Sequence, residues 1–147
     1  MIYSVGYARM TPNDLVTLAD SLGLDAVVDV RAKPVSRKPG FGGRQLASLL
    51  SARYQWAGDT LGGLGARATS EGLALLRRSE EKGRTIALLC LEEAPGDCHR
   101  HGAIATALLP DIEVRHIYMP ERAIIDASEL ERSLRDGNDY QCEEFEL

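Results

Sequence analysis

The clearest buried strand of the sequence is Thr85-Ile86-Ala87-Leu88-Leu89-Cys90. An apolar run of this length predicts a strand that is covered on both faces, as strands of parallel sheets are. A second run of this kind, Ala26-Val27-Val28-Asp29-Val30, is β-branched and nearly all apolar. The two stretches decide the fold class, because a sheet buried on both faces needs helices on both sides.

Amphipathic helices are predicted between the strands. Thr11 and Pro12 mark a helix start, with Thr11 as the cap and Pro12 at the first helical position, and Gly23 ends this helix. A later helix over about 70–82 has Ser70 as its predicted cap. The predicted inward-facing side chains are Leu15, Leu18, Ala19 and Leu22, then Leu46, Leu49 and Leu50, and finally Leu73, Leu75 and Leu76.

The remaining segments continue this alternation. Further strands are predicted over 1–5, 54–57 and 113–118, helices over about 44–52, 98–109 and 128–134, and loops over 34–43 and 58–65. Strand and helix alternate at least four times, which favours right-handed crossovers and a parallel sheet. We therefore expect one α/β domain over residues 1–147, a three-layer Rossmann-like domain with a mostly parallel sheet flanked by helices.

Composition sets the broad class of protein. A chain of 147 residues with 44% hydrophobic residues fits one globular domain that needs no disulfides. The chain contains neither a leader-like segment nor an apolar run near the roughly 18 residues of a membrane span, so no membrane partner is expected. Three cysteines are an odd number and do not resemble a disulfide framework, which indicates free thiols and a cytoplasmic location.

Charge is distributed unevenly along the chain. The net charge of -5 argues against sequence-blind nucleic-acid binding. No acidic residue occurs between Asp29 and Asp59, however, and this window is basic. Its basic residues are Arg31, Lys33, Arg37, Lys38, Arg44 and Arg53. Locally, the sequence is therefore compatible with an anionic small molecule or a nucleic-acid substrate as partner.

Three segments that carry chemistry follow predicted strands. They are Gly6-Tyr7-Ala8-Arg9, Asp29-Val30-Arg31 and Cys90-Leu91-Glu92. Ligands of open parallel sheets bind outside the carboxyl ends of the strands. We therefore expect these three segments to converge on one site.

The basic segment offers groups that suit an oxyanion. Arg31, Ser36 and Arg37 supply donors, and a guanidinium binds phosphate or carboxylate in a bidentate manner. Asp29 either orients Arg31, as a loop organiser, or handles a proton. A solvated basic loop without a ligand is the structural alternative, and it fits Lys33 and Lys38 best.

A thiol, an imidazole and a guanidinium are adjacent in Cys98-His99-Arg100, at a predicted helix start. That position favours a thiolate at Cys98, although Asp97 competes for the cap and would oppose it. His99 is a candidate general acid or base. Arg100 is the favoured anion-binding residue of this segment. Glu92 either pairs with Arg100 or acts as a base on water.

Metal and nucleotide sites are not expected. Cys90, Cys98, His99 and His101 are four candidate ligands, but their spacing is not a paired Cys-x-x-Cys motif. Adjacent side chains on a helix point in different directions, so Cys98 and His99 should not share a metal ion. The glycine-rich loops of dinucleotide and nucleoside triphosphate sites do not occur in the sequence. We expect no cofactor.

Several separated motifs together resemble the Domain of Unknown Function 488 family, over nearly the whole chain. They are Ser4-Val5-Gly6-Tyr7, Thr11-Pro12, Asp29-Val30-Arg31, Pro34, Ser36-Arg37, Leu61-Gly62-Gly63, Cys90-Leu91-Glu92 and Cys98-His99-Arg100. The resemblance implies a compact α/β domain with a shared pocket, and it assigns no reaction. Members often carry histidine where this chain has Tyr7, so the resemblance does not supply a proton-transfer role there.

Two thiol-enzyme families give a sharper contrast. Rhodanese-like domains are similar in the placement of Asp29, Arg31 and Cys90, but the carboxylates that follow Cys90 oppose a thiolate or persulfide. A tyrosine-phosphatase loop needs an arginine six positions after its cysteine. Gly96 and Ile104 stand at those positions after Cys90 and Cys98. The sequence therefore disfavours phosphatase chemistry of this type.

Three functional hypotheses remain from the sequence. The leading hypothesis is a small enzyme that acts on a phosphorylated or other anionic substrate, related to nucleotides or nucleic acid, in an arginine-lined pocket. Its candidate residues are Asp29, Glu92, Cys98 and His99 for catalysis, and Tyr7, Arg31, Ser36, Arg37 and Arg100 for binding. The alternatives are a non-catalytic module that binds nucleic acid or an acidic partner, and rhodanese-like sulfur chemistry through Cys90 or Cys98.

Overall fold

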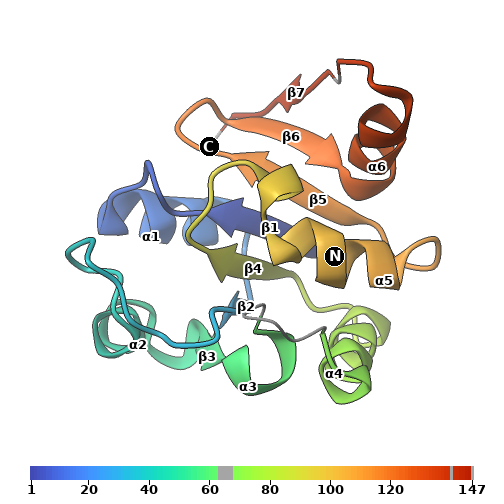
Figure 1. Ribbon diagram of the computed structural model, residues 1–147. Helices are drawn as coiled ribbons and strands as arrows, with labels where there is room; N and C mark the ends of the chain where they lie inside the picture. Colours follow the sequence, from blue (N-terminus) through green and yellow to red (C-terminus); the bar gives the residue numbers. More distant parts are fainter. Residues whose placement is uncertain (63–67, 140, 147) are drawn as a thin grey trace.

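Seven strands form one sheet in the order β3-β2-β4-β1-β5-β6-β7, in a computed structural model that describes residues 1–62, 68–139 and 141–146 (Figure 1). The strands are β1 (Ile2–Gly6), β2 (Ala26–Asp29), β3 (Tyr54–Trp56), β4 (Ile86–Cys90), β5 (Val114–Tyr118), β6 (Ala123–Asp126) and β7 (Glu143–Glu144). β3, β2, β4, β1 and β5 run parallel to one another. β6 and β7 pair antiparallel at one edge.

Helices connect the strands as the alternation predicts. They are α1 (Pro12–Ser21), α2 (Gly43–Leu50), α3 (Gly58–Leu61), α4 (Ser70–Glu81), α5 (Thr106–Leu108) and α6 (Ala127–Asp136). Shorter turns are η1 (Ser51–Arg53), η2 (Pro95–Asp97) and the π-helical η3 (Arg100–Ala105). Thr11 caps α1 as predicted, because its hydroxyl accepts from Asp14 N and the Asp14 carboxylate accepts from Thr11 N.

Two apolar layers enclose the sheet, which confirms the α/β class and the three-layer arrangement. On one face, β4 buries Ala87 and Leu89 against α1 and α2. On the other face, Ile86 and Leu88 pack in the layer to which α3, α4, α5 and α6 contribute. Side chains of one strand alternate between the two faces, so an all-apolar strand serves both layers. Figure 1 shows the helices on the two sides of the sheet.

Several local predictions are wrong. The cap of α4 is Thr69, whose hydroxyl accepts from Gly72 N, and not Ser70. Leu49 and Leu75 are partly exposed rather than inward-facing. Residues 58–61 of the predicted loop form α3, and 63–65 lie outside the described residues. The antiparallel strands β6 and β7 follow β5 without a prediction from the sequence.

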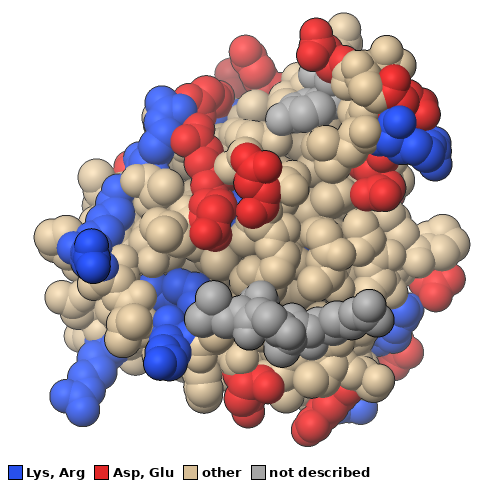
Figure 2. Space-filling model, viewed as in Figure 1, with Lys and Arg blue, Asp and Glu red and all other residues tan. Residues whose placement is uncertain are grey.

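The surface reflects the uneven charge of the sequence. Figure 2 shows Lys and Arg side chains on the side of this face where α1, α2 and the segment after β2 lie. Acidic side chains gather over the loop that follows β4. Among the described residues, no helix combines the length and the apolar character that a membrane span requires.

Candidate functional site

The carboxyl ends of β1, β2 and β4 lie side by side. Beyond β1, Tyr7 N donates to Cys90 O at 3.0 Å and Ala8 N donates to Leu91 O at 3.0 Å. Beyond β2, Val30 N donates to Leu89 O at 3.1 Å. A Cβ atom on Gly6 would overlap the carbonyl of Glu92, so this close approach of backbones requires glycine.

A cavity of about 450 Å³ opens at this edge of the sheet. Its lining residues are Tyr7, Arg31, Ala32, Lys33, Val35, Cys90, Leu91, Glu92, Asp97, Cys98 and His99. All three strand-end segments singled out in the sequence contribute to it. We call Tyr7, Asp29 and Arg31 the Arg31 wall, and Cys90, Cys98 and His99 the thiol wall.

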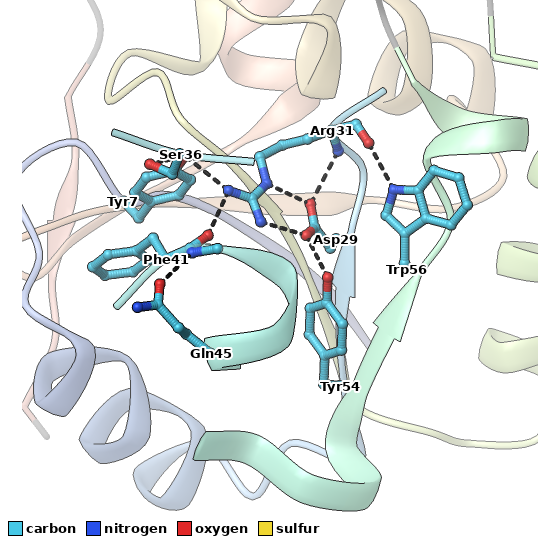
Figure 3. Close-up of polar contacts among 9 residues, drawn as sticks. Tyr7, Asp29, Arg31, Ser36, Phe41, Gln45, Tyr54 and Trp56 are labelled. Carbon is cyan, nitrogen blue, oxygen red and sulfur yellow. Dashed lines mark hydrogen bonds and ion pairs between the residues drawn. The ribbon is translucent and has the colours of Figure 1, made fainter. Parts of the chain in front are cut away.

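Asp29 and Arg31 form a buried bidentate ion pair. Arg31 Nε donates to Asp29 Oδ1 at 2.8 Å and Arg31 Nη2 donates to Asp29 Oδ2 at 2.6 Å (Figure 3). Asp29 also accepts from Arg31 N at 3.1 Å and from the Tyr54 hydroxyl at 2.7 Å. Both carboxylate oxygens are thus occupied, which favours a positioning role for Asp29 over proton transfer.

The rest of the Arg31 guanidinium is held by neighbouring loops. Its Nη1 donates to Tyr7 Oη at 2.9 Å and to Phe41 O at 2.7 Å. Tyr7 stacks on Phe41 with 4.5 Å between ring centroids, and its hydroxyl donates to Ser36 Oγ at 3.1 Å. Figure 3 shows these side chains around the guanidinium. The arrangement fixes Arg31 and leaves little of its surface for a ligand.

Burial and the charge of Asp29 shift the pKa of Arg31 in opposite directions. Burial by itself lowers the pKa of Arg31, but the hydrogen bonds and charge of Asp29 and the contact with Tyr7 outweigh it, and the pKa is raised. Burial also raises the pKa of Tyr54, and its hydrogen bond to Asp29 adds to the shift. At neutral pH the ion pair of Asp29 and Arg31 therefore lies beside the neutral phenol of Tyr54.

On the thiol wall, the His99 ring has one defined tautomer when neutral. Its Nε2 lies 2.9 Å from Val30 O, and a carbonyl accepts only, so Nε2 carries the proton. Its Nδ1 therefore presents a lone pair, 3.7 Å from Cys98 Sγ. The imidazole can accept the thiol proton of Cys98 without turning.

The expectation that Cys98 and His99 point in different directions is wrong. Cys98 has extended backbone, with φ -126° and ψ 145°, and the helical backbone begins only at His99. Neighbours on either side of such a junction do not follow helical spacing. The sulfurs of Cys90 and Cys98 and a ring nitrogen of His99 all lie within 4.8 Å of one another.

The Arg100 side chain lies inside the protein, although the sequence favoured it for anion binding. It is 0% exposed, and its Nε donates to Cys98 Sγ at 3.4 Å. Its Nη1 donates to Ser4 Oγ at 3.1 Å and its Nη2 to the backbone carbonyl of Glu92 at 2.5 Å. The bond to Glu92 thus uses the main chain and not the carboxylate. Arg100 supports Cys98 from behind and does not line the cavity.

The two thiols differ in acidity. A hydrogen bond with Cys90 lowers the pKa of Cys98; burial opposes this shift, and His99 and Arg100 add to it. The same hydrogen bond raises the pKa of Cys90, together with burial and the charges of Cys98 and Glu92. The pKa of His99 is raised chiefly by its hydrogen bond to Cys98, against burial. Both shifts favour Cys98 over Cys90 as the more acidic thiol of the pair.

The remaining predicted residues divide between the cavity and the surface. Glu92 is exposed at the cavity, where its Oε2 accepts from Cys90 Sγ at 3.4 Å. Lys33, ranked below the arginines from sequence, also lines the cavity. Arg37 is exposed and lies outside the lining, and Ser36 belongs to a neighbouring, mostly apolar hollow of about 710 Å³ beside Trp56. Val35 lines both spaces.

A buried polar chain behind Arg100 was missed from the sequence. Ser4 Oγ lies 2.6 Å from His116 Nδ1, His116 Nε2 lies 3.1 Å from His101 Nδ1, and His101 Nε2 lies 3.0 Å from Glu131 Oε2. At one end of this chain Arg100 donates to Ser4, and at the other end the Glu131 carboxylate accepts from His101. Ser4, His116 and His101, when the two rings are neutral, therefore each donate a hydrogen bond to the next residue toward Glu131. Burial lowers the pKa of His116 to about 3, and the charges of Arg100 and His101 contribute. Ser4, a hydroxyl residue in the largely apolar strand β1, was the available signal.

Residues 11–69 match the family model described as "Domain of unknown function DUF488". The matched region runs from the cap of α1 to the cap of α4 and includes Asp29 and Arg31, whereas the thiol wall follows it. No curated protein and no solved structure matched the chain.

Proposed function

We propose that the chain, whose residues 11–69 match the domain of unknown function DUF488, is a small enzyme that acts on an anionic substrate in the cavity at the carboxyl edge of its sheet. The observation that carries this proposal is the placement of Lys33 and Arg31 with Glu92 around one cavity. A cation can hold an anionic substrate there while a carboxylate accepts a proton.

Lys33 is the main anion-binding residue in this proposal. Asp29 compensates the charge of Arg31 and occupies two of its nitrogens. Lys33 has an exposed ammonium group and no such partner among the described contacts. Arg31 then contributes a fixed, partly neutralised donor, and Asp29 and Tyr7 position it.

Glu92 is the proposed proton acceptor. Its carboxylate reaches the cavity, and the described contact of that carboxylate is a weak donor, the thiol of Cys90 at 3.4 Å. A carboxylate with free lone pairs can order and deprotonate a water molecule. Asp29 has no such freedom, so we assign the proton-handling role to Glu92 alone.

Binding is tested with inorganic phosphate, pyrophosphate and AMP in thermal-shift titrations. Lys33→Ala should weaken the affinity for the anion that stabilises the wild type by about tenfold, or ~1.4 kcal/mol. Arg37→Ala is the matched control, because Arg37 is exposed in the same basic segment but lies outside the cavity. Equal affinity of Lys33→Ala and wild type, or no stabilisation by any of the three anions, would overturn the proposal.

Catalysis is tested with p-nitrophenyl phosphate. Glu92→Gln should bind phosphate as the wild type does and lose roughly 100-fold in turnover, because an amide cannot accept the proton. A wild type that binds phosphate without turning over the ester would instead support the non-catalytic binding module.

Thiol chemistry at Cys98 is a second candidate, favoured by one specific observation. Cys98 Sγ lies between His99 Nδ1 and Arg100 Nε, which together stabilise a thiolate. Alkylation by iodoacetamide, followed residue by residue with mass spectrometry, tests it. A thiolate at Cys98 predicts fast alkylation below pH 7, whereas Cys142 should react only at higher pH. Slow alkylation of Cys98 at every pH below 8 would remove this candidate.

A further inference from the structure

The thiol wall brings three potential metal-ligand atoms together. The sulfurs of Cys90 and Cys98 and a ring nitrogen of His99 lie within 4.8 Å of one another. Sulfur and imidazole nitrogen are soft to intermediate ligands, which suit zinc and disfavour calcium or magnesium. The residues come from two segments, the end of β4 and the turn before η3, that the fold holds together.

The spacing of these atoms suits a tetrahedral ion. Zinc lies about 2.3 Å from sulfur and about 2.0–2.1 Å from imidazole nitrogen, so tetrahedral ligands stand roughly 3.5–3.8 Å apart. Cys98 Sγ and His99 Nδ1 are 3.7 Å apart, within that range. All three ligand atoms lie within 4.8 Å of one another.

The surroundings of His99 already hold the ring as a metal ligand would need. A zinc-bound histidine donates its other ring nitrogen to a carbonyl or carboxylate, which fixes the ring and its tautomer. His99 Nε2 donates to Val30 O at 2.9 Å, so Nδ1 faces the two sulfurs with its lone pair. The acceptor of this contact is a backbone carbonyl directly after β2.

The surroundings of Cys98 are equally ordered. Arg100 donates to Cys98 Sγ through Nε, and its two other nitrogens are anchored on Ser4 and on the backbone of Glu92. A buried cation that points an N–H at a thiolate stabilises the charged, ligating form of the sulfur. The arrangement explains why an arginine with 0% exposure is kept beside a cysteine.

We propose that Cys90, Cys98 and His99 bind one zinc ion whose fourth coordination position opens into the cavity beside Glu92. Three protein ligands with an open position are typical of catalytic zinc sites, whereas structural sites have four. Zinc would supply a polarised water or an electrophile for the anionic substrate. Use of the ion in a reaction rests on the proposed function, but binding of the ion does not.

The direct test is metal binding to the full chain. Protein stripped with a chelator is titrated with Zn²⁺ and, separately, with Co²⁺, and metal content is measured by mass spectrometry. We expect one ion per chain and cobalt–thiolate absorption bands in the near ultraviolet. Cys98→Ser and His99→Ala should each weaken affinity by more than about 100-fold, beyond the loss typical of outer-shell changes. Cys142→Ser, outside the thiol wall, is the matched control and should bind as the wild type.

A readout without mutation guards against variants that fail to fold. Zinc should protect Cys90 and Cys98 of the wild type from iodoacetamide and leave Cys142 reactive. Absence of stoichiometric zinc binding, or unchanged affinity in folded Cys98→Ser, would overturn the metal site. Loss of zinc in Glu92→Gln would overturn the open fourth position, because Glu92 would then be a ligand.

The two proposals fail in different ways. Stoichiometric zinc with no stabilisation by phosphate, pyrophosphate or AMP would leave the metal site and remove the anionic substrate. Anion binding that depends on Lys33, in a chain that takes up no zinc, would do the reverse. Fast alkylation of Cys98 in zinc-saturated protein would also overturn the metal site, and it would favour the thiol candidate.

Discussion

The two walls of the cavity are built on opposite principles. On the Arg31 wall, an acid and a base satisfy each other, and the guanidinium is further held by Tyr7 and Phe41. On the thiol wall, Cys90, Cys98 and His99 bring three potential ligand atoms together, and Arg100 donates to Cys98 Sγ from behind. The charged groups of the Arg31 wall are paired with one another, whereas the side chains of the thiol wall can also bind or react with a ligand. The fixed ion pair thus lies at and after the end of β2, and the reactive side chains lie at and after the end of β4.

This division gives the two walls different sensitivities. A change on the Arg31 wall should appear in folding stability, because it leaves a buried charge without its partner. A change on the thiol wall should appear in ligand binding and reactivity. The predictions below test this separation.

The largest effect is expected from Asp29→Ala. It leaves the Arg31 guanidinium buried without its carboxylate and should lower the free energy of unfolding by about 3–5 kcal/mol. Urea denaturation measures it, and Asp29→Asn serves if the alanine variant does not fold. Asp20→Ala is the control, because it breaks an exposed ion pair with Arg53 and should cost less than about 1 kcal/mol. Similar losses in the two variants would contradict the distinction.

A smaller effect is expected from zinc on the thiol wall. Free zinc at 100 times its dissociation constant should raise the free energy of unfolding by about 2.7 kcal/mol, because it binds the folded chain. Urea midpoints with zinc and with a chelator measure the difference. Cys98→Ser should lose the response and Cys142→Ser should keep it. A response of equal size in both variants would place the zinc elsewhere.

The polar chain behind Arg100 predicts a dependence on pH. His116 has a pKa of about 3 in the folded protein against 6.5 as its ordinary value, so the unfolded chain binds more protons between these values. Stability is then complete above pH 6.5 and is lost as pH falls. At pH 5 the loss is about 2 kcal/mol, from roughly 1.4 kcal/mol per pKa unit.

His116→Gln isolates this contribution, because glutamine has no charge to gain. Urea denaturation of both proteins at pH 5 and pH 8 should show a smaller decrease in the variant by about 2 kcal/mol. If the free energy of unfolding decreased by the same amount in the two proteins between pH 8 and pH 5, His116 would not be the group that titrates. Ser4 and His101 contact His116, and the charge of Arg100 acts on it; all three residues are the same in both proteins.

The fold was predictable because its signals are local and redundant. β4 is apolar on both faces, β2 is apolar up to Asp29, and α1 carries its cap, its proline and its stop within the sequence. The antiparallel edge was not predictable in this way, since β6 and β7 are short, and β6 depends on pairing with β5 and β7 on pairing with β6. Short strands of this kind are stabilised by their neighbours more than by their own sequence.

The candidate site was predictable in place but not in detail. Topology alone indicated that Tyr7, Arg31 and Glu92 follow strands that end at one edge. Sequence spacing could not show that Arg100 turns inward or that Cys98 is extended, because both depend on the backbone at one junction. Which of Arg31, Arg37 and Arg100 can bind an anion depends on the burial of each side chain. The pattern of charges along the sequence does not indicate that burial.

The smallest effect is expected from Ser36→Ala, at the rim of the Arg31 wall. The change removes the acceptor of the Tyr7 hydroxyl, 3.1 Å away, and should cost about 0.5–1.5 kcal/mol. Ser36 is half-buried, so water can replace it, and Tyr7 still accepts from Arg31 at 2.9 Å. Urea denaturation beside Asp29→Ala measures the ratio of the two losses. A loss at Ser36 as large as that at Asp29 would mean that the hydroxyl network, and not the ion pair, holds the Arg31 wall together.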